Sequence, residues 1–352
     1  MKRFALYVYS LFVLFIIYLI LILSYATLTD YQPEDFKIIS TQKIGDDYLK
    51  IDSFYQVLNW NIGYAGLGEE SDFFYDGGKQ ARTTKVNVKK NLKGIEGLLQ
   101  QMSSIDFILF QELDIKSKRS YYINQLYRFD SLLMDHQAFF TYNLHVDFIP
   151  KPFLDPIGYV RSGLASFCRT KAFQVEVHQY PSSYDWPRSC LMLDRCILVK
   201  RFKTEDKKEF ILINNHNSAF DKGQLKKSEM AYLKDFILKE YNAGNYVLVG
   251  GDFNQCPPNF DPKIFNEDSD YMRTYISADF MPDDWQWLYD STIPTNRQML
   301  SSYEHGVTNT TLIDYYLASP NIEVQEVKCL NMDFKFSDHQ PVYLAFKFNG
   351  QK

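Results

Sequence analysis

Residues 247–255 read Val-Leu-Val-Gly-Gly-Asp-Phe-Asn-Gln, an apolar run that ends in two glycines and then presents two polar side chains. A short uncharged run of this kind predicts a buried strand. Asp252 and Asn254 are two positions apart, so in an extended segment both side chains leave the same side of the chain. A carboxylate can orient a water molecule or bind a metal ion, and an amide can donate to a developing oxyanion. The pattern predicts a polar site at the end of a buried strand.

The composition is that of a folded protein: of 352 residues, 46% are hydrophobic and 23% charged, and the chain has no internal repeat. Helical and strand-like patterns alternate early, while strands dominate later, which predicts a mixed α/β domain with helices outside large sheets. We expect one catalytic domain over residues 51–350, because no linker divides it. Residues 27–50, with Pro33 and Gly45, predict a polar connector.

Hydrophobic periodicity places the individual elements. Helices are expected at 88–102, 120–140 and 225–237, with Gly244 as a helix cap. Strands are expected at 53–60, 105–110, 163–168, 172–179, 191–202, 209–214, 311–318, 322–330 and 340–348, and in the run that ends at Asp252. Residues 141–162 predict an irregular aromatic loop, and residues 256–310 predict a loop-rich region.

The first 26 residues form a separate segment. Lys2 and Arg3 precede an uncharged apolar run that extends from Phe4 to Leu23, and a run of about 20 such residues can cross a bilayer as a helix. The residues 24–26, Ser-Tyr-Ala, leave a cleaved signal peptide as the alternative, but the apolar run is longer than a usual signal. We expect a single-pass membrane anchor, with the catalytic domain on the extracytoplasmic side by the positive-inside rule.

The formal charge of −5 weighs against a general nuclease, because proteins that grip duplex DNA usually present a basic face. Lys116, Lys118 and Arg119 form one small basic cluster that suits a phosphate substrate. The five cysteines show no metal-site spacing. Cys190 and Cys196 are candidates for a disulfide, and the alternative is that they are small buried hydrophobes.

Further polar clusters accompany other strand-like runs. They comprise Asn59-Trp60-Asn61, Glu112, Asn215-His216-Asn217, Asp314 and Ser337-Asp338-His339. Four of them have a purely structural alternative: a turn asparagine for Asn61, a solvated acid for Glu112 and a hydrogen-bonded histidine for His216. For Asp314, which interrupts an apolar strand, the alternative is a buried salt bridge to Arg161, Arg169 or Arg195.

Together the motifs Asn-Trp-Asn-Ile, Phe-Gln-Glu, Gly-Asp-Phe-Asn, Ile-Asp-Tyr and Ser-Asp-His follow one another between about Phe54 and Phe348. In this order the sequence resembles the endonuclease/exonuclease/phosphatase superfamily, which includes DNase I-like nucleases, AP endonucleases, neutral sphingomyelinases and inositol polyphosphate phosphatases. The resemblance implies a four-layer α/β sandwich in which two mixed β-sheets are flanked by helices, here preceded by one N-terminal transmembrane helix.

The resemblance also implies a metal site. Carried onto this chain, Glu112 is the principal ligand of Mg²⁺, with Asn61 beside it and Asp338 as a further acidic residue near the metal. Mn²⁺ is the alternative cation. Hard divalent cations prefer oxygen ligands, which these side chains supply.

The catalytic roles follow from the same resemblance. Asp252 positions or deprotonates the attacking water, while Asn254 and His216 donate to the scissile phosphate. Asp314 holds His339, which acts on the phosphate or as a general base. The implied reaction is metal-assisted, in-line attack of water on a phosphodiester.

The substrate is less constrained. Val249-Gly250 before Asp252 and Gln255-Cys256 after Asn254 disfavour the inositol phosphatase branch, and Leu312-Ile313 replaces the arginine that AP endonucleases usually place before their last aspartate.

The anchor favours a phospholipid or sphingomyelin head group as substrate. Trp285, Trp287 and the aromatic segments 141–159 and 64–75 are candidates for membrane contact, or alternatively for core packing. An extracytoplasmic endo- or exonuclease and a non-catalytic membrane-bound binding module remain alternatives, and we predict no protein partner.

Overall fold

The computed structural model describes residues 2–41, 47–219, 221, 223–265, 271 and 274–350. Gly45 of the expected connector lies outside the described residues. The helices are α1 (Lys2–Leu28), α2 (Lys85–Gln101), α3 (Gln125–Leu132) and α4 (Gln224–Asn242). The strands are β1 (Phe36–Thr41), β2 (Tyr55–Asn61), β3 (Phe107–Asp114), β4 (Gln137–Ile149), β5 (Gly158–Cys168), β6 (Gln174–Gln179), β7 (Cys196–Lys203), β8 (Glu209–His216), β9 (Tyr246–Asp252), β10 (Gln286–Leu288), β11 (Asn296–Arg297), β12 (Thr310–Thr311), β13 (Asp314–Ala318), β14 (Ile322–Cys329) and β15 (Val342–Phe348).

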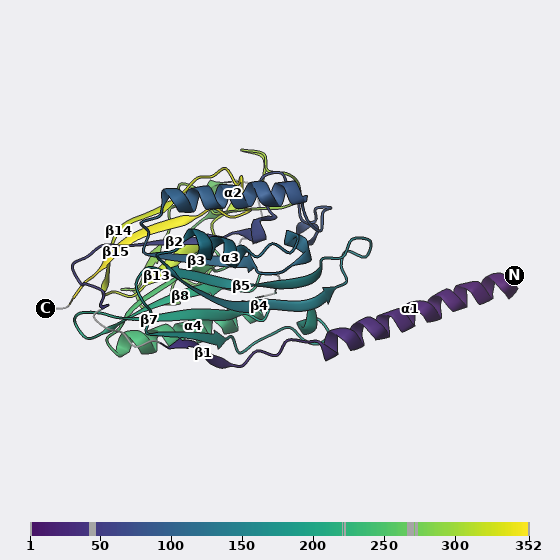
Figure 1. The fold of residues 1–352 in the computed structure, drawn as a ribbon, viewed down its shortest axis with the longest axis horizontal. Helices are drawn as coiled ribbons and strands as arrows, with labels where there is room; N and C mark the ends of the chain where they lie inside the picture. Colours follow the sequence, from purple (N-terminus) through teal and green to yellow (C-terminus); the bar gives the residue numbers. More distant parts are fainter. Residues whose placement is uncertain are drawn as a thin grey trace.

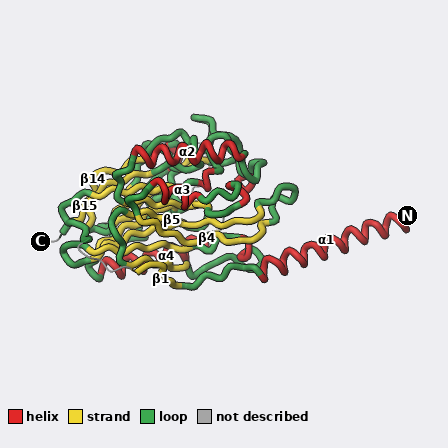
Figure 2. The backbone as a smooth tube through the Cα atoms, viewed as in Figure 1, coloured by secondary structure: helices red, strands yellow, loops and turns green. Residues whose placement is uncertain are grey.

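Two mixed sheets form the centre of the domain. One has the strand order β1-β6-β7-β8-β9-β13-β10, and the other has the order β14-β15-β2-β3-β5-β4. Each sheet contains one parallel pair, β8 with β9 and β2 with β3, while its other neighbours are antiparallel. The helix that connects each parallel pair, α4 or α2, lies on the outer face of its own sheet (Figures 1 and 2). This is the arrangement expected of a strand–helix–strand crossover.

Three buried clusters define four layers. The cluster between the sheets includes Leu109, Leu248 and Tyr316. On the outer faces, α2 and α3 pack against Trp60 and its neighbours, and α4 packs through Leu233 against the other sheet. The expected four-layer α/β sandwich is therefore confirmed, as is the long apolar helix at the N-terminus.

Several sequence-based expectations were wrong in detail. The helix expected at 120–140 is only the short α3, because β4 begins at Gln137. The expected loop at 141–162 is instead most of β4 and the start of β5, which form a long hairpin. The expected connector contains β1, which pairs with β6 at the edge of a sheet. For Cys190 and Cys196, by contrast, the alternative of small buried hydrophobes holds, because both are free and buried.

Lys200 of β7 is fully buried between the two sheets, and its ammonium donates to the carbonyl oxygen of Leu198 (3.2 Å). Burial lowers its pKa from 10.5 to about 7. The unfolded chain therefore binds more protons than the folded one between these two values, so Lys200 destabilises the fold most below pH 7 and not at all above pH 10.5.

We expect Lys200→Met to raise the Tm by about 5 °C or more at neutral pH. Thermal melts from pH 7 to pH 10.5 check this, since the gain should shrink toward the upper limit as wild-type Lys200 loses its proton. A gain that is the same at both ends of the range would show that packing, not charge, is responsible.

Candidate active site

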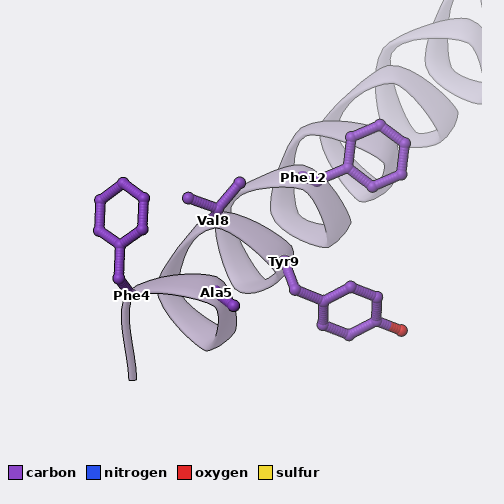
Figure 3. A pocket seen from close by; sticks show the side chains of 5 residues that line it. All are labelled: Phe4, Ala5, Val8, Tyr9 and Phe12. Atoms are coloured by element: carbon purple, nitrogen blue, oxygen red, sulfur yellow. The ribbon is translucent and has the colours of Figure 1, made fainter. Parts of the chain in front are cut away.

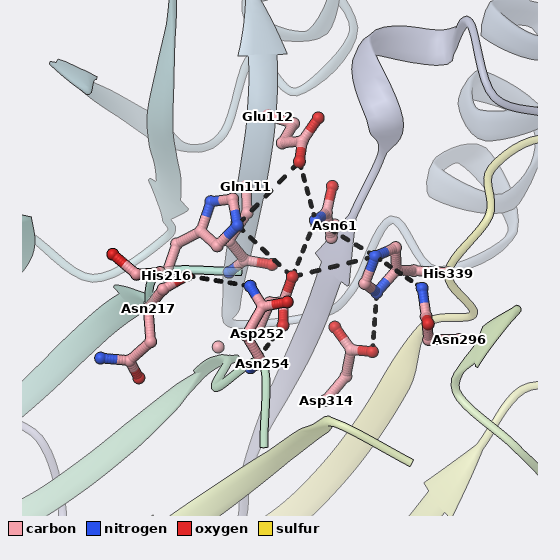
Figure 4. Close-up of polar contacts among 12 residues, drawn as sticks. Asn61, Gln111, Glu112, His216, Asn217, Asp252, Asn254, Asn296, Asp314 and His339 are labelled. Carbon is pink, nitrogen blue, oxygen red and sulfur yellow. Dashed lines mark hydrogen bonds and ion pairs between the residues drawn. The ribbon is translucent and has the colours of Figure 1, made fainter. Parts of the chain in front are cut away.

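The candidate site lies where the two sheets meet at one edge. Side chains alternate between the faces of a strand, and Val57 of β2 and Leu212 of β8 both point into the core between the sheets. Asn61 and His216 follow at the even spacing that keeps them on these inner faces. The parallel register aligns His216 with Asp252 across β8 and β9, so the ends of both parallel pairs present polar groups to one space (Figure 4).

Asp252 is the centre of the contacts. Its Oδ2 accepts from Asn61 Nδ2 (3.1 Å) and lies 3.4 Å from His216 Nε2 and 3.8 Å from His339 Nε2. Its Oδ1 accepts from the backbone N–H of Asn254 (2.9 Å). The bond from Asn61 joins the two sheets, because Asn61 ends β2 and Asp252 ends β9.

A carboxylate–imidazole pair lies next to it. His339 Nδ1 is 2.8 Å from Asp314 Oδ2, and Asp314 is fully buried. The three arginines considered as partners of Asp314 bond elsewhere: Arg161 to Asp147, Arg169 to a backbone carbonyl and Arg195 to the carbonyl of His216. Within the described residues, Asp314 thus holds His339, as the resemblance implied.

Two site residues have left-handed backbones. Glu112, at φ 53°, occupies the bulge where the β3–β5 register shifts between Phe110 and Leu113. Asn254 has φ 50°. Positive φ is uncommon for residues other than glycine, and such strain is concentrated at functional sites. The bulge turns the Glu112 carboxylate toward Asn61 Nδ2 (3.5 Å) and His216 Nε2 (4.0 Å).

The surroundings shift the pKa values of the two site histidines in opposite directions. Burial, Arg195 and His339 lower the pKa of His216 well below 6.5, which favours the neutral form of this ring. Burial alone would also lower the pKa of His339, but the charges of Asp314, Asp338 and Asp252 outweigh it and raise the pKa well above 6.5. Burial raises the pKa of Asp338 to about 7 and that of Asp314 to about 6. One imidazole can donate without charge, and the other can hold a proton.

The donor set fits a hard divalent cation. Asp338 is buried, and the charge of Glu112 contributes to the rise in its pKa, which is the repulsion that a bound cation would relieve. Asp252, Asp314 and His339 also bring ligand atoms within 4.8 Å of one another, but Asp314 and His339 already bond each other. Glu112 and Asp338 are therefore the better candidate ligands.

Asn61 was expected beside the metal. Its Oδ1 accepts from the backbone N–H of Gly63 (3.0 Å), and its amide nitrogen faces the carboxylates of Glu112 and Asp252. In this orientation Asn61 fixes two carboxylates in place. Gly63 has φ +47°, and a Cβ there would lie 2.7 Å from Asp338 Oδ1, so the close approach requires glycine.

A layer of buried side-chain amides, formed by Asn59, Gln111 and Asn214, lies between the candidate site and the apolar core. Gln111 donates to the side-chain oxygens of Asn59 (2.9 Å) and Asn214 (2.7 Å). Asn59 in turn donates to the carbonyl of Gly251 (3.2 Å). The bonds to Asn214 and Gly251 cross between the sheets, and all three bonds satisfy groups that would otherwise be costly to bury. Asn59 belonged to a recognised motif, but nothing in the sequence predicted this layer.

No sequence motif predicted that Asn296 and Tyr271 would lie at the site. Asn296 Nδ2 lies 3.0 Å from His339 Nε2, and Tyr271 donates to Asn296 Oδ1 (2.6 Å). Both residues come from the loop-rich stretch between β9 and β13, where no strand pattern marks a site.

Asn254 was expected to donate to the phosphate. Its side-chain amide donates one N–H to the carbonyl of Asn217 (2.9 Å) and retains a second N–H.

The residues of the expected basic cluster differ in exposure, and Lys116 is the exposed member. Arg119 is buried, bonds Asp114 (3.0 Å) and stacks on Tyr64, while Lys118 donates to the carbonyl of Pro156.

Trp285 is buried, and Trp287 is partly buried and packs against the same core cluster as α4. For these tryptophans the core alternative holds.

The fold and these motifs can be compared with known proteins. A family model described as Endonuclease/Exonuclease/phosphatase matches residues 58–339. The chain belongs to the endonuclease/exonuclease/phosphatase family. Members of this family are typically hydrolases that act on phosphoester bonds and generally depend on divalent metals. No curated protein matches the chain by sequence.

Solved structures of the family share the fold. An endonuclease/exonuclease/phosphatase from Beutenbergia cavernae is 16% identical with a TM-score of 0.58, and the match covers 84% of this chain and 72% of that one. D. rerio TDP2 complexed with single strand DNA product is 15% identical with a TM-score of 0.53, covering 84% and 100%. The human Nocturnin catalytic domain with bound sulfate is 16% identical with a TM-score of 0.51, covering 89% and 96%. At these identities the likeness concerns the fold.

Proposed function

We propose that this protein is a membrane-anchored, divalent-cation-dependent phosphodiesterase whose substrate is a phospholipid or sphingomyelin head group. The observation that supports it most is the meeting of Asp252 with the buried Asp314–His339 pair at the junction of the sheets. A water-orienting carboxylate next to a carboxylate–histidine pair is an arrangement suited to hydrolysis near neutral pH.

Each residue has a chemical role in the proposal. Asp252 orients the attacking water, and His339, fixed by Asp314, exchanges a proton at Nε2. His216 is neutral and nearly fully buried, with its Nε2 facing Asp252 and Glu112, where it can donate to a phosphate oxygen. A cation held by Glu112 and Asp338, Mg²⁺ or Mn²⁺, supplies charge neutralisation of the phosphate oxygens when bound.

The helix α1 supports the membrane part of the proposal. Its most apolar window has a mean hydropathy of 2.8, and no residue of that window is buried against the protein. A shallow hollow on α1 is lined by Phe4, Ala5, Val8, Tyr9 and Phe12, which project away from the helix (Figure 3). Such a surface is suited to lipid rather than to water. Lys2 and Arg3, at the start of α1 before its apolar run, favour an extracytoplasmic domain.

We expect chelation with EDTA to abolish hydrolysis of bis-p-nitrophenyl phosphate, and Mg²⁺ or Mn²⁺ to restore it. The full-length protein in detergent should also gain thermal stability when Mg²⁺ is added, because a ligand that binds the folded state alone raises the Tm. Glu112→Gln should lose both effects. Activity that survives exhaustive chelation would contradict the proposal.

A nucleic acid is the second candidate substrate. The similar zebrafish structure was determined with a single strand DNA product. Parallel assays of the wild-type protein on sphingomyelin vesicles and on plasmid DNA separate the two. Turnover of DNA alone would favour the extracytoplasmic nuclease, and turnover of none of the phosphodiesters would favour the non-catalytic binding module.

A further inference from the structure

The tip of the β4–β5 hairpin exposes two large apolar side chains. Phe153 is 73% exposed and Leu154 is 93% exposed. The flanks of the tip are fixed, because Arg82 pairs with Asp155 (2.6 Å) and Lys118 donates to the carbonyl of Pro156 (2.9 Å). The apolar pair is therefore held outward by polar contacts on one side, which marks a contact surface.

The tip reaches α1. The Phe153 ring meets the Tyr18 ring edge-on at 6.2 Å between centroids. Nearer the end of the helix, Trp186 is 60% exposed and donates to Thr27 Oγ1 (3.0 Å). Tyr18 lies about 8 Å inside the end of the apolar run at Leu23, given the rise of an α-helix. In a bilayer spanned by α1, Phe153 is thus level with the hydrocarbon and Trp186 with the interface.

Strand directions place the candidate site at the same edge. β4 is antiparallel to β5 and β5 is antiparallel to β3, so β3 and β4 run the same way. The carboxyl ends of β2 and β3, where Asn61 and Glu112 lie, therefore face the side on which the hairpin turns. Figure 1 shows that α1 also leaves the domain on this side.

The dimensions agree with a site near the lipid surface. Gly163 of β5 pairs with Leu113, next to Glu112, and Gly158 begins the strand at the hairpin turn. These five residues of extended chain place the turn about 17 Å beyond Glu112. If the tip enters the hydrocarbon by about 8 Å and crosses a head-group layer of about 6 Å, these two depths account for about 14 Å of the distance between the turn and Glu112.

We propose that the β4–β5 tip enters the bilayer that holds α1, forming a second membrane contact that turns the candidate site toward the lipid head groups. The occupant of this apolar surface is the lipid around the chain's own helix. The inference rests on the anchoring and the phosphodiesterase activity proposed above, and it adds that substrate is taken directly from the membrane surface.

Depth measurement tests the contact without reference to activity. The native cysteines are all buried, so a nitroxide can be attached selectively to Leu154→Cys in the full-length protein, reconstituted in phosphatidylcholine vesicles. Met134→Cys is the matched control, because Met134 is 87% exposed and precedes β4 at the opposite end of that strand. We expect the label at 154 to be accessible to oxygen and shielded from a water-soluble nickel complex, and the label at 134 to show the reverse.

Activity tests the consequence. Phe153→Ser/Leu154→Ser should hydrolyse bis-p-nitrophenyl phosphate at the wild-type rate, while its turnover of sphingomyelin in phosphatidylcholine vesicles falls about tenfold or more. Met134→Ser should leave both rates unchanged. The rate with the soluble substrate shows whether each variant is folded and whether the chemistry of its site is intact.

The outcomes separate the two proposals. A label at 154 that contacts the nickel complex as freely as the label at 134, or one shielded from both reagents by a second protein copy, overturns the membrane contact even if catalysis is intact. Equal loss on soluble and vesicle substrates by the serine variant also overturns it. Absence of turnover by the wild-type protein with normal depth of the label refutes the proposed activity instead.

Discussion

Purified His339→Ala protein should lose phosphodiesterase activity by a factor of about 10²–10⁴ and stay folded. The imidazole lies 3.8 Å from Asp252 and is fixed by Asp314 at 2.8 Å, so its removal eliminates proton exchange at the centre of the site. The buried Asp314 can then become neutral by taking up a proton, which limits the cost to stability. Steady-state rates with bis-p-nitrophenyl phosphate and a thermal melt check both parts.

Two controls make this expectation specific. His178→Ala breaks another histidine–carboxylate contact, that with Glu176 at 2.9 Å in β6, and should leave activity unchanged. Asp314→Asn should lower kcat by itself, but combining it with His339→Ala should reduce activity no further, because the two residues act as one unit. Additive losses in the double variant would show that Asp314 does not act through His339.

Asp252→Asn should reduce kcat by a factor of about 10³ or more with little change in KM. The substitution keeps the shape of the side chain but removes the negative charge that receives the Asn61 amide at 3.1 Å and faces two imidazoles. Because the carboxylate is assigned to the attacking water rather than to substrate binding, kcat is the constant that should respond. Full kinetic curves for both proteins check the division between kcat and KM.

A matched control is Asp206→Asn. Asp206 also accepts hydrogen bonds, from Thr204 and from the Tyr246 hydroxyl (2.7 Å), but it precedes β8 at the end of that strand opposite His216. It should leave kcat unchanged. If Asp252→Asn retained kcat within about tenfold of wild type, the assignment of Asp252 to the reacting water would be wrong.

Much of the architecture follows from local pattern. The run that ends at Asp252 is apolar and short, and the run that ends at Asn61 is short and uncharged, so both are identified as strands without any tertiary information. The candidate site residues were predicted for the same reason, since each polar group ends, interrupts or precedes such a run. By contrast, the strand ends that carry these groups lie close together only because the two sheets dock, and no local sequence pattern predicts that docking.

The failures have physical causes as well. The hairpin at 141–162 contains Pro150, Pro152, Pro156 and Gly158, whose turn signal hid two long strands that are stabilised by pairing with each other rather than by local preference. Asn296 reaches His339 because β11, which pairs with β12, also forms a bridge to His339. Contacts across long sequence distance leave no periodic trace.

The amide layer formed by Asn59, Gln111 and Asn214 has a consequence for how the protein matures. Its bonds link β2 and β3 of one sheet to β8 of the other, so neither half of the chain can complete the layer before its counterpart has docked. We therefore expect newly made chains to organise the candidate cation site late, in the same cooperative step in which the two sheets dock. Appearance of tight cation binding during refolding should mark that final assembly event rather than the earlier growth of β-structure.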